Sequence, residues 1–213
     1  SSPGITSPRP SYASSRPSSS AAIEADIVFY TATPAAWSAV YGRAVAQGFE
    51  ALWSAASPSW NPAFVAEDSA IRDAIARDMY VPLYYEPWGG ESEGAARVRE
   101  IMEAAGAPPS DFYAEGFVEA EILRTALEAA YEAGDMTQSG VLAAAKSLET
   151  VTFDGLAPEE TYVGEPNDIV QREIFIARPA PGSLTGTELI ESFYTSPVAA
   201  NFEFNEACYF LEG

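Results

Sequence analysis

The amino-acid sequence predicts an α/β protein whose parallel strands are flanked by helices. Two short apolar runs, residues 26–30 and 49–55, enclose a segment with helical periodicity. Strand, helix and strand within roughly 30 residues form the βαβ unit of a parallel sheet. The composition agrees, because 47% of the 213 residues are hydrophobic and 20% are charged. A chain of this length and composition can bury a substantial core.

The first unit carries recognisable boundaries. Residues 26–30 lack helical periodicity and are expected to form a buried strand. Pro34 suits the first turn of a helix, and Thr33 is placed to cap that helix. The helix is expected over 35–47, and Gly48 is expected to end it in the left-handed conformation.

The next segment alternates loops and regular elements. Residues 57–62 contain two prolines and are expected to form a loop, followed by a helix over 63–77. Residues 79–85 read as a strand, and its proline favours a place at a sheet edge or a crossing point. Residues 86–94 hold three glycines and are expected to form another loop.

The clearest helix is expected over residues 111–133, where apolar residues recur at three- and four-residue spacing. Thr137 is placed to cap the helix that follows it. The other elements expected after residue 94 are helices over 95–105 and 138–148, an irregular acidic stretch over 150–164, a strand over 170–178 and a short helical turn over 189–193.

Charge and composition exclude several classes of function. The formal net charge of −20 would repel both nucleic acid and anionic lipid, so neither is expected as a partner. Histidine is absent, and Cys208 is the single cysteine, so a zinc site and a histidine-based triad are excluded. No phosphate-binding glycine motif is present. We therefore expect no metal and no cofactor.

The acidic residues allow one alternative and disfavour another. Glu86, Glu91 and Glu93 lie close to Trp88 in the sequence, which allows the alternative of a hydrolase that uses paired carboxylates. The acidic residues between 154 and 168 match no calcium-binding loop, and we expect a solvated surface there.

Aromatic and hydroxyl side chains follow each of the three predicted strands of the first part. The carboxyl ends of parallel strands meet at one edge of a sheet, and ligands bind at that edge in open α/β sheets. Aromatic walls with a few hydroxyls suit a small polar or neutral ligand. The alternative is that Trp60 and Trp88 are packing residues of the core. The candidate ligand-binding residues are Tyr30, Thr31, Thr33, Ser57, Ser59, Trp60, Tyr85 and Trp88.

Four stretches, in this order, resemble the C-terminal half of the type I solute-binding proteins of ABC importers, the branched-chain amino acid binding family. The second stretch contains a Ser-Pro-Ser-Trp-Asn-Pro sequence similar to actinobacterial members. Together the stretches span residues 23–160. They read ADIVFYTATPAAWSAVYGRAVAQGF, SAASPSWNPAF, PLYYEPWGG and FYAEGFVEAEILRTALEAAYEAGDMTQSGVLAAAKSL.

The resemblance implies a type I periplasmic-binding-protein fold with two α/β lobes, incomplete in this chain. Residues 1–22 are rich in Ser and Pro and are expected to be a tether or a fragment edge. Residues 23–85 would form part of the second lobe, and residues 86–165 would return to the first lobe. Residues 166–213 would supply a hinge strand and the C-terminal segment of the second lobe.

The resemblance also implies function. Such a protein is not an enzyme; it closes on a small polar solute about a hinge and delivers it to an ABC permease in the membrane. Its place would be the periplasm or the extracellular face of the membrane, with a lipid anchor at an N-terminus outside this chain. Cys208 is either a buried small hydrophobic residue or, as export would permit, the disulfide partner of a cysteine in a part absent here. The extracellular ligand-sensing domain of a receptor, which uses the same fold, is the other alternative.

The resemblance bears on the ligand through two positions. Tyr30 matches the aromatic residue that follows the second-lobe strand in the family. The stretch that holds a carboxylate for the ligand's ammonium group in many members is Ala55-Ala56-Ser57 here. An amide, a short peptide, a urea-like solute or a neutral compound is therefore a better expectation than an α-amino acid.

Overall fold

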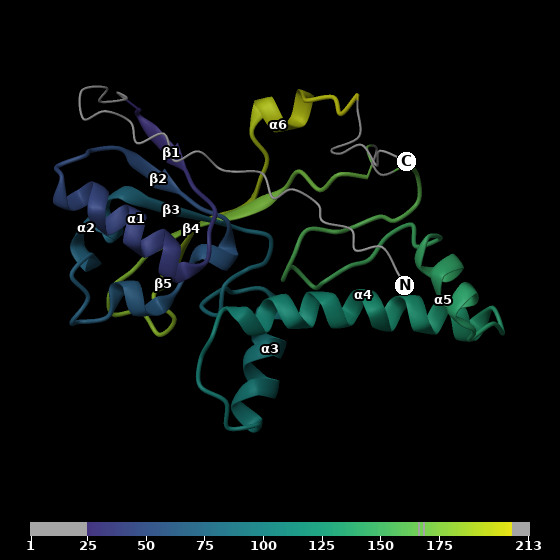
Figure 1. Ribbon diagram of the computed structural model, residues 1–213. Helices are drawn as coiled ribbons and strands as arrows, with labels where there is room; N and C mark the ends of the chain where they lie inside the picture. Colours follow the sequence, from purple (N-terminus) through teal and green to yellow (C-terminus); the bar gives the residue numbers. More distant parts are fainter. Residues whose placement is uncertain (1–24, 166, 168, 206–213) are drawn as a thin grey trace, which may run out of the picture.

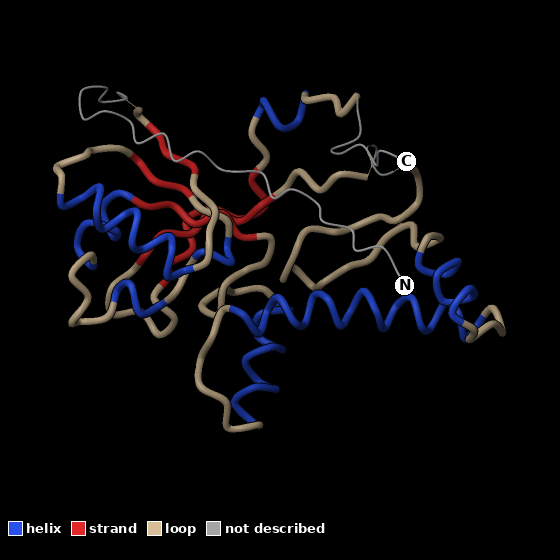
Figure 2. The backbone as a smooth tube through the Cα atoms, viewed as in Figure 1, coloured by secondary structure: helices blue, strands red, loops and turns tan. Residues whose placement is uncertain are grey.

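The computed structural model describes residues 25–165, 167 and 169–205. These residues form one five-stranded sheet in the order β1-β2-β3-β4-β5, with helices beside it (Figures 1 and 2). The strands are β1 Ile27–Phe29, β2 Leu52–Ser54, β3 Met79–Leu83, β4 Ile174–Pro179 and β5 Thr187–Tyr194. The helices are α1 Pro34–Ala46, α2 Arg72–Asp78, α3 Glu93–Ala104, α4 Phe112–Glu132, α5 Gln138–Ala145 and α6 Pro197–Asn201. Two short 3-10 helices, η1 Ser57–Ser59 and η2 Pro62–Val65, follow β2.

The predicted βαβ unit is confirmed. Strands β1, β2 and β3 are parallel, and the register aligns Val28 with Trp53 and Trp53 with Met79. Helix α1 connects the first two strands, and Gly48 follows it with φ of 72°, the left-handed conformation expected there. Thr33 occupies the N-cap position in an extended conformation, but its side chain makes no capping hydrogen bond.

The sheet is mixed, which the sequence did not predict. Strand β4 pairs with β3 in the antiparallel direction, and β5 pairs with β4 in the same way. The short helical turn expected over 189–193 is wrong, because these residues belong to β5. Leu189 is aligned with Ala177, and Glu191 with Ile176. The pairing with β4 determines this conformation, and a pattern read along one segment does not contain it.

Strand β3 lies in the middle of the sheet, so of the two places expected for its proline, an edge or a crossing point, the edge is wrong. The ladder to β2 ends at Tyr80, whereas the ladder to β4 continues through Pro82 and Leu83. The helix expected over 63–77 is also interrupted. Ala66 is extended and ends η2, and helical structure resumes only at α2.

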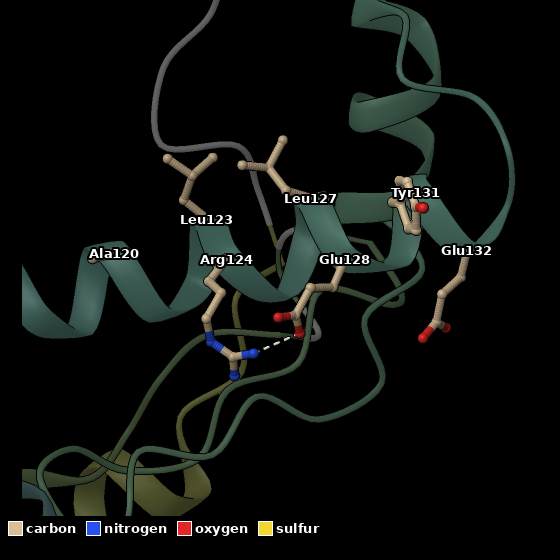
Figure 3. Close-up of a pocket in the computed structure, with 7 residues that line it drawn as sticks. All are labelled: Ala120, Leu123, Arg124, Leu127, Glu128, Tyr131 and Glu132. Atoms are coloured by element: carbon tan, nitrogen blue, oxygen red, sulfur yellow. Dashed lines mark hydrogen bonds and ion pairs between the residues drawn. The ribbon is translucent and has the colours of Figure 1, made fainter.

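Helices α4 and α5 form an arm that extends away from the sheet (Figure 1). The arm buries small residues, including Ala114, Ala126 and Ala130. Its opposite face is apolar and is left uncovered by the described part of the chain, with Leu123 56% and Tyr131 75% exposed. A shallow groove of about 480 Å³ runs along this face of α4 (Figure 3). It is lined by Ala120, Leu123, Arg124, Leu127, Glu128, Tyr131 and Glu132.

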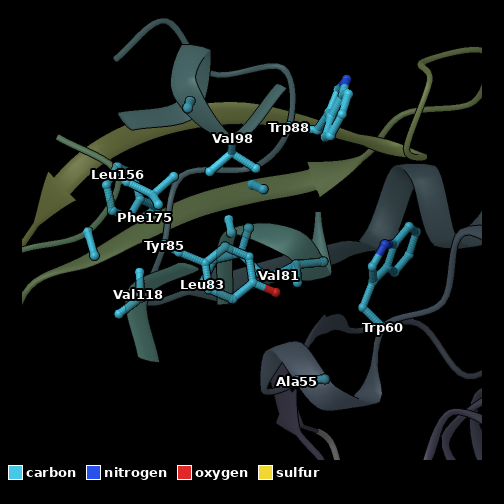
Figure 4. Packing of buried hydrophobic residues seen from close by; sticks show 14 of the residues in the cluster. Ala55, Trp60, Val81, Leu83, Tyr85, Trp88, Val98, Val118, Leu156 and Phe175 are labelled. Atoms are coloured by element: carbon cyan, nitrogen blue, oxygen red, sulfur yellow. The ribbon is translucent and has the colours of Figure 1, made fainter. Parts of the chain in front are cut away.

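The main core lies between one face of the sheet, helix α1 and the start of the arm (Figure 4). Trp37 and Tyr41 of α1 are fully buried and stack with ring centroids 5.0 Å apart. Trp53 meets Tyr41 edge to face at 5.2 Å. Phe175 of β4 is also fully buried. Apolar side chains from the segments before and after the arm in the sequence therefore share one core.

The other face of the parallel strands is uncovered. Ile27 and Phe29 are 65% and 67% exposed, and Leu52 and Tyr80 are 46% and 42% exposed. These residues lie on one face because side chains alternate along a strand and the register aligns Ile27 with Leu52. Parallel sheets normally carry helices on both faces. The described chain covers one of them.

Candidate ligand-binding site

The loops that follow β1 and β2 are joined by one buried serine. Ser59 Oγ accepts a hydrogen bond from the Ala32 N–H at 3.0 Å and donates one to the Ala32 carbonyl oxygen at 2.7 Å. Ser59 is fully buried, so water does not compete for these bonds. The structure thus brings residues 30–33 and 57–60 together at the carboxyl ends of neighbouring parallel strands.

The loop after β3 reaches the same place through Tyr85. Its ring is buried, and its phenol group lies beside the Ser57 hydroxyl. Burial raises the pKa of Tyr85, and the negative charge of Glu115 adds to the effect. Tyr85 is therefore neutral at physiological pH and offers a hydroxyl rather than a phenolate.

The predicted ligand-binding residues differ in exposure. Thr31 and Thr33 are exposed, and Tyr30 is half-buried. The remaining five are buried in the core, and they are Ser57, Ser59, Trp60, Tyr85 and Trp88. The three loops are therefore adjacent, but among the predicted ligand-binding residues only those after β1 present side chains to solvent.

Trp60 lies at this edge with an unused donor. It is 3% exposed and packs edge to face on Phe64 with ring centroids 5.8 Å apart. Its Nε1–H has no acceptor among the described residues, as is also the case for Trp37. A buried donor without a partner costs on the order of 1–3 kcal/mol. An acceptor brought next to Trp60 would remove that cost.

Residues 86–92, here called the crossing loop, lie between β3 and α3 and are held by side-chain hydrogen bonds. Glu86 is 6% exposed, and its carboxylate accepts the N–H groups of Glu91 at 3.2 Å and Ser92 at 3.1 Å. Arg99 donates to the carbonyl oxygens of Trp88 at 2.6 Å and Gly90 at 2.7 Å. The buried carboxylate therefore shapes the loop.

A polar pocket of about 660 Å³ lies between the crossing loop and the β4–β5 hairpin. Its lining includes Glu86, Gly90, Glu91, Ser183, Thr187 and Glu188, and none of the predicted ligand-binding residues. The hairpin and the crossing loop are far apart in the sequence, and no local pattern indicates that they meet. Sequence reasoning therefore missed the hairpin as part of this surface.

Other predicted features lie elsewhere. Within the described ranges, no cluster of His, Cys, Asp or Glu is arranged to hold a metal ion. Cys208 and the Ser/Pro-rich segment 1–22 lie outside the described residues. In the same described part of the chain, no helix has the length and apolar character needed to cross a membrane.

The fold and the three adjacent loops define an α/β protein of the solute-binding class. The sequence model of the family described as periplasmic binding protein matches residues 18–182, and the chain belongs to this family. Its members are the substrate-binding proteins of ABC transporters and not enzymes, which confirms the predicted family and the predicted absence of catalysis. No match was found among curated proteins.

Three solved structures show the type I fold. A fatty acid ABC transporter substrate-binding protein from Thermomonospora curvata is 20% identical with a TM-score of 0.72, over 83% of this chain and 45% of its own. A branched-chain amino acid ABC transporter protein from Thermus thermophilus with bound valine is 17% identical with a TM-score of 0.60, over 82% and 47%. A leucine-binding protein from Thermotoga maritima is 15% identical with a TM-score of 0.58, over 79% and 44%.

These likenesses confirm the predicted incomplete type I fold. The chain spans about half the length of the solved proteins that it matches. The uncovered face of the sheet and the uncovered face of α4 are consistent with that fraction.

Proposed function

We propose that this chain forms about half of the extracellular solute-binding component of an ABC importer. The component closes on a small polar solute about a hinge and passes it to a membrane permease. The observation that carries the proposal is the pair of hydrogen bonds between Ser59 and Ala32. These bonds join two strand-end loops at the ligand-binding edge of a fold that belongs to this family.

The chain divides between two lobes in this proposal. Residues 23–85 and 166–213 belong to the second lobe, and residues 86–165 belong to the first. The division is supported by the crossing loop, which leads the chain out of the sheet, and by β4, which returns to pair with β3. Residues 1–22 serve as a tether. A lipid anchor and a disulfide from Cys208 belong to the same proposal for the complete protein.

The exposed apolar faces also support this division. Leu123, Leu127 and Tyr131 project from α4 one turn apart and are exposed (Figure 3). Burial of apolar area is favourable by about 25 cal/mol per Å². We expect the remaining part of the first lobe to cover this face, and the remaining part of the second lobe to cover Ile27, Phe29, Leu52 and Tyr80.

The ligand is proposed to lie between the lobes against Tyr30, Thr31 and Thr33. Behind them, the bonds of Ser59 and the buried side chains of Ser57, Tyr85, Trp60 and Trp88 set the shape of the wall. No carboxylate is present between Ala55 and Trp60 to hold an ammonium group. Without that carboxylate, an amide, a urea-like solute, a short peptide or another neutral compound is favoured over an α-amino acid.

A ligand screen tests this assignment. The native protein is combined with acetamide, urea, a neutral dipeptide, leucine and octanoate, and its melting temperature is measured. One of the first three is expected to raise it, because a ligand that binds only the folded state stabilises it. Leucine tests the α-amino acid alternative, and octanoate tests the fatty acid named for one relative.

The matched variants are Tyr30→Ala and Val40→Ala. Val40 is 44% exposed on α1 and belongs to no predicted ligand-binding loop. Tyr30→Ala is expected to weaken the binding of the solute identified in the screen at least about tenfold, the effect of losing roughly 1.4 kcal/mol. Val40→Ala is expected to leave it unchanged. Equal affinity of the Tyr30→Ala variant and the parent would refute the site.

A further inference from the structure

Asp111 directly precedes α4, yet it does not act as a helix cap. An aspartate at this position usually accepts a backbone N–H of the first turn. Here the backbone of Asp111 is already helical, with φ of −65° and ψ of −26°, and its side chain makes no capping bond. The carboxylate points away from the helix that it begins, and it has a different set of partners.

Both carboxylate oxygens of Asp111 are used in contacts with other elements. Oδ1 accepts the N–H of Trp88 in the crossing loop at 2.8 Å. Oδ2 accepts the hydroxyl of Thr187, the first residue of β5, at 2.5 Å. Asp111 is 6% exposed and Thr187 is 7% exposed, so both bonds are shielded from water. One carboxylate therefore connects three segments of the chain.

The two hydrogen bonds stabilise the buried carboxylate of Asp111. In the described part of the chain, no Lys or Arg forms an ion pair with Asp111. A buried carboxylate without an ion pair depends on its hydrogen-bond donors. Thr187 is held in turn by Thr185, whose hydroxyl oxygen lies 3.3 Å from that of Thr187.

We propose that Asp111 is a positioning residue that fixes the first-lobe part of the chain against the sheet. The proposal rests on the proposed function, because it uses the division into lobes: Asp111 lies in the first-lobe part and Thr187 in the second-lobe part. The bond between them joins two side chains, so it can open without breaking a strand ladder or a helix. The bond to Trp88 keeps Asp111 attached to the crossing loop while the other bond opens.

The first test measures the orientation of the arm in solution. Spin labels are attached to Val40→Cys on α1 and Ala143→Cys on α5, both exposed positions, in the native protein with Cys208 and any cysteine that pairs with it replaced by Ser. Distances between the labels are measured by pulsed electron paramagnetic resonance. Thr187→Val removes the hydroxyl and keeps the shape, and it is expected to broaden the distance distribution about twofold. Thr187→Ser keeps the hydroxyl and is expected to match the parent.

The second test measures hydrogen exchange at the Trp88 amide. Asp111→Ala removes its acceptor and is expected to raise the exchange rate about tenfold, the effect of one lost hydrogen bond. Thr187→Val leaves that acceptor in place and is expected to change the rate less than twofold. This difference distinguishes the bond to Trp88 from the bond to Thr187. It can be measured even if Asp111→Ala lowers the melting temperature.

The outcomes are distinct from those of the ligand screen, because neither readout uses a solute. A broadened distribution for Thr187→Val and a parent-like one for Thr187→Ser would support the proposal, whether or not a solute is found. An unchanged distribution for Thr187→Val would overturn it, even if that variant melts at a lower temperature, because Thr187 would then contribute stability alone. Failure of the screen with intact positioning would overturn only the proposed function.

Discussion

The sheet with α1 and the arm of α4 and α5 bury apolar surface in different ways. The sheet packs large aromatic side chains on one another, with Trp37 and Tyr41 fully buried. The arm buries chiefly small residues such as Ala126 and Ala130, and it leaves Leu123 and Leu127 exposed. The first region therefore has much of its own core. The second depends more on local helix stabilisation and, in our proposal, on a surface supplied by the rest of the protein.

The largest expected contrast comes from one truncation in each region. Trp37→Ala empties a fully buried site and is expected to lower the free energy of unfolding by about 3–5 kcal/mol. Leu123→Ala in the chain alone is expected to change it by less than about 0.5 kcal/mol, because Leu123 is 56% exposed. Urea unfolding measures both. Equal losses in the two variants would abolish the contrast.

The crossing loop, which leads from the sheet to α3 and so towards the arm, is expected to give an intermediate change in stability. A Cβ on Gly90 would lie 2.1 Å from Cδ of Glu86, whereas a Cβ on Gly89 would meet nothing within 4 Å. Gly90→Ala is expected to lower the free energy of unfolding by about 1–3 kcal/mol, through overpacking of a buried loop. Gly89→Ala is the matched control and is expected to be nearly neutral. A neutral Gly90→Ala variant would show that the loop is not held as described.

The smallest effect tests local stabilisation of the arm. The Thr137 hydroxyl oxygen accepts the N–H of Gly140 at 3.2 Å and caps α5. Thr137→Ala is expected to cost about 1 kcal/mol, and Thr137→Ser, which keeps the hydroxyl, only a few tenths. Circular dichroism during thermal unfolding measures the difference. If both variants match the parent, the cap does not stabilise the arm, and packing alone would account for α5.

Sequence reasoning succeeded where the determinants of structure are local. The helix expected over 111–133 is α4, and the strand, helix and strand expected before residue 55 are β1, α1 and β2. The Thr137 cap was found in the same way. Helical periodicity, proline and glycine positions and capping residues are properties of a continuous segment of sequence, and they predict these elements well.

The remaining features depend on partners distant in sequence. Strand β5 forms because β4 lies beside it. Asp111 does not cap its helix because its carboxylate accepts bonds from Trp88 and Thr187, which are 23 and 76 residues distant in the sequence. The candidate site was predicted as three adjacent loops, and two of them are joined by Ser59. The sequence did not decide whether Trp60 and Trp88 are buried. The sequence around an aromatic residue in a loop does not distinguish a core position from a ligand-binding one.

The central claim is that this chain is about half of a two-lobed binding protein whose other half covers its exposed apolar faces. The most direct test is the intact mass of native protein captured with an antibody against residues 138–148. We predict a mass near twice that of the 213 residues, from one polypeptide or from two in equal amounts, as the 45% coverage of a solved relative suggests. A mass equal to the 213 residues, with no stoichiometric partner polypeptide, would contradict the claim.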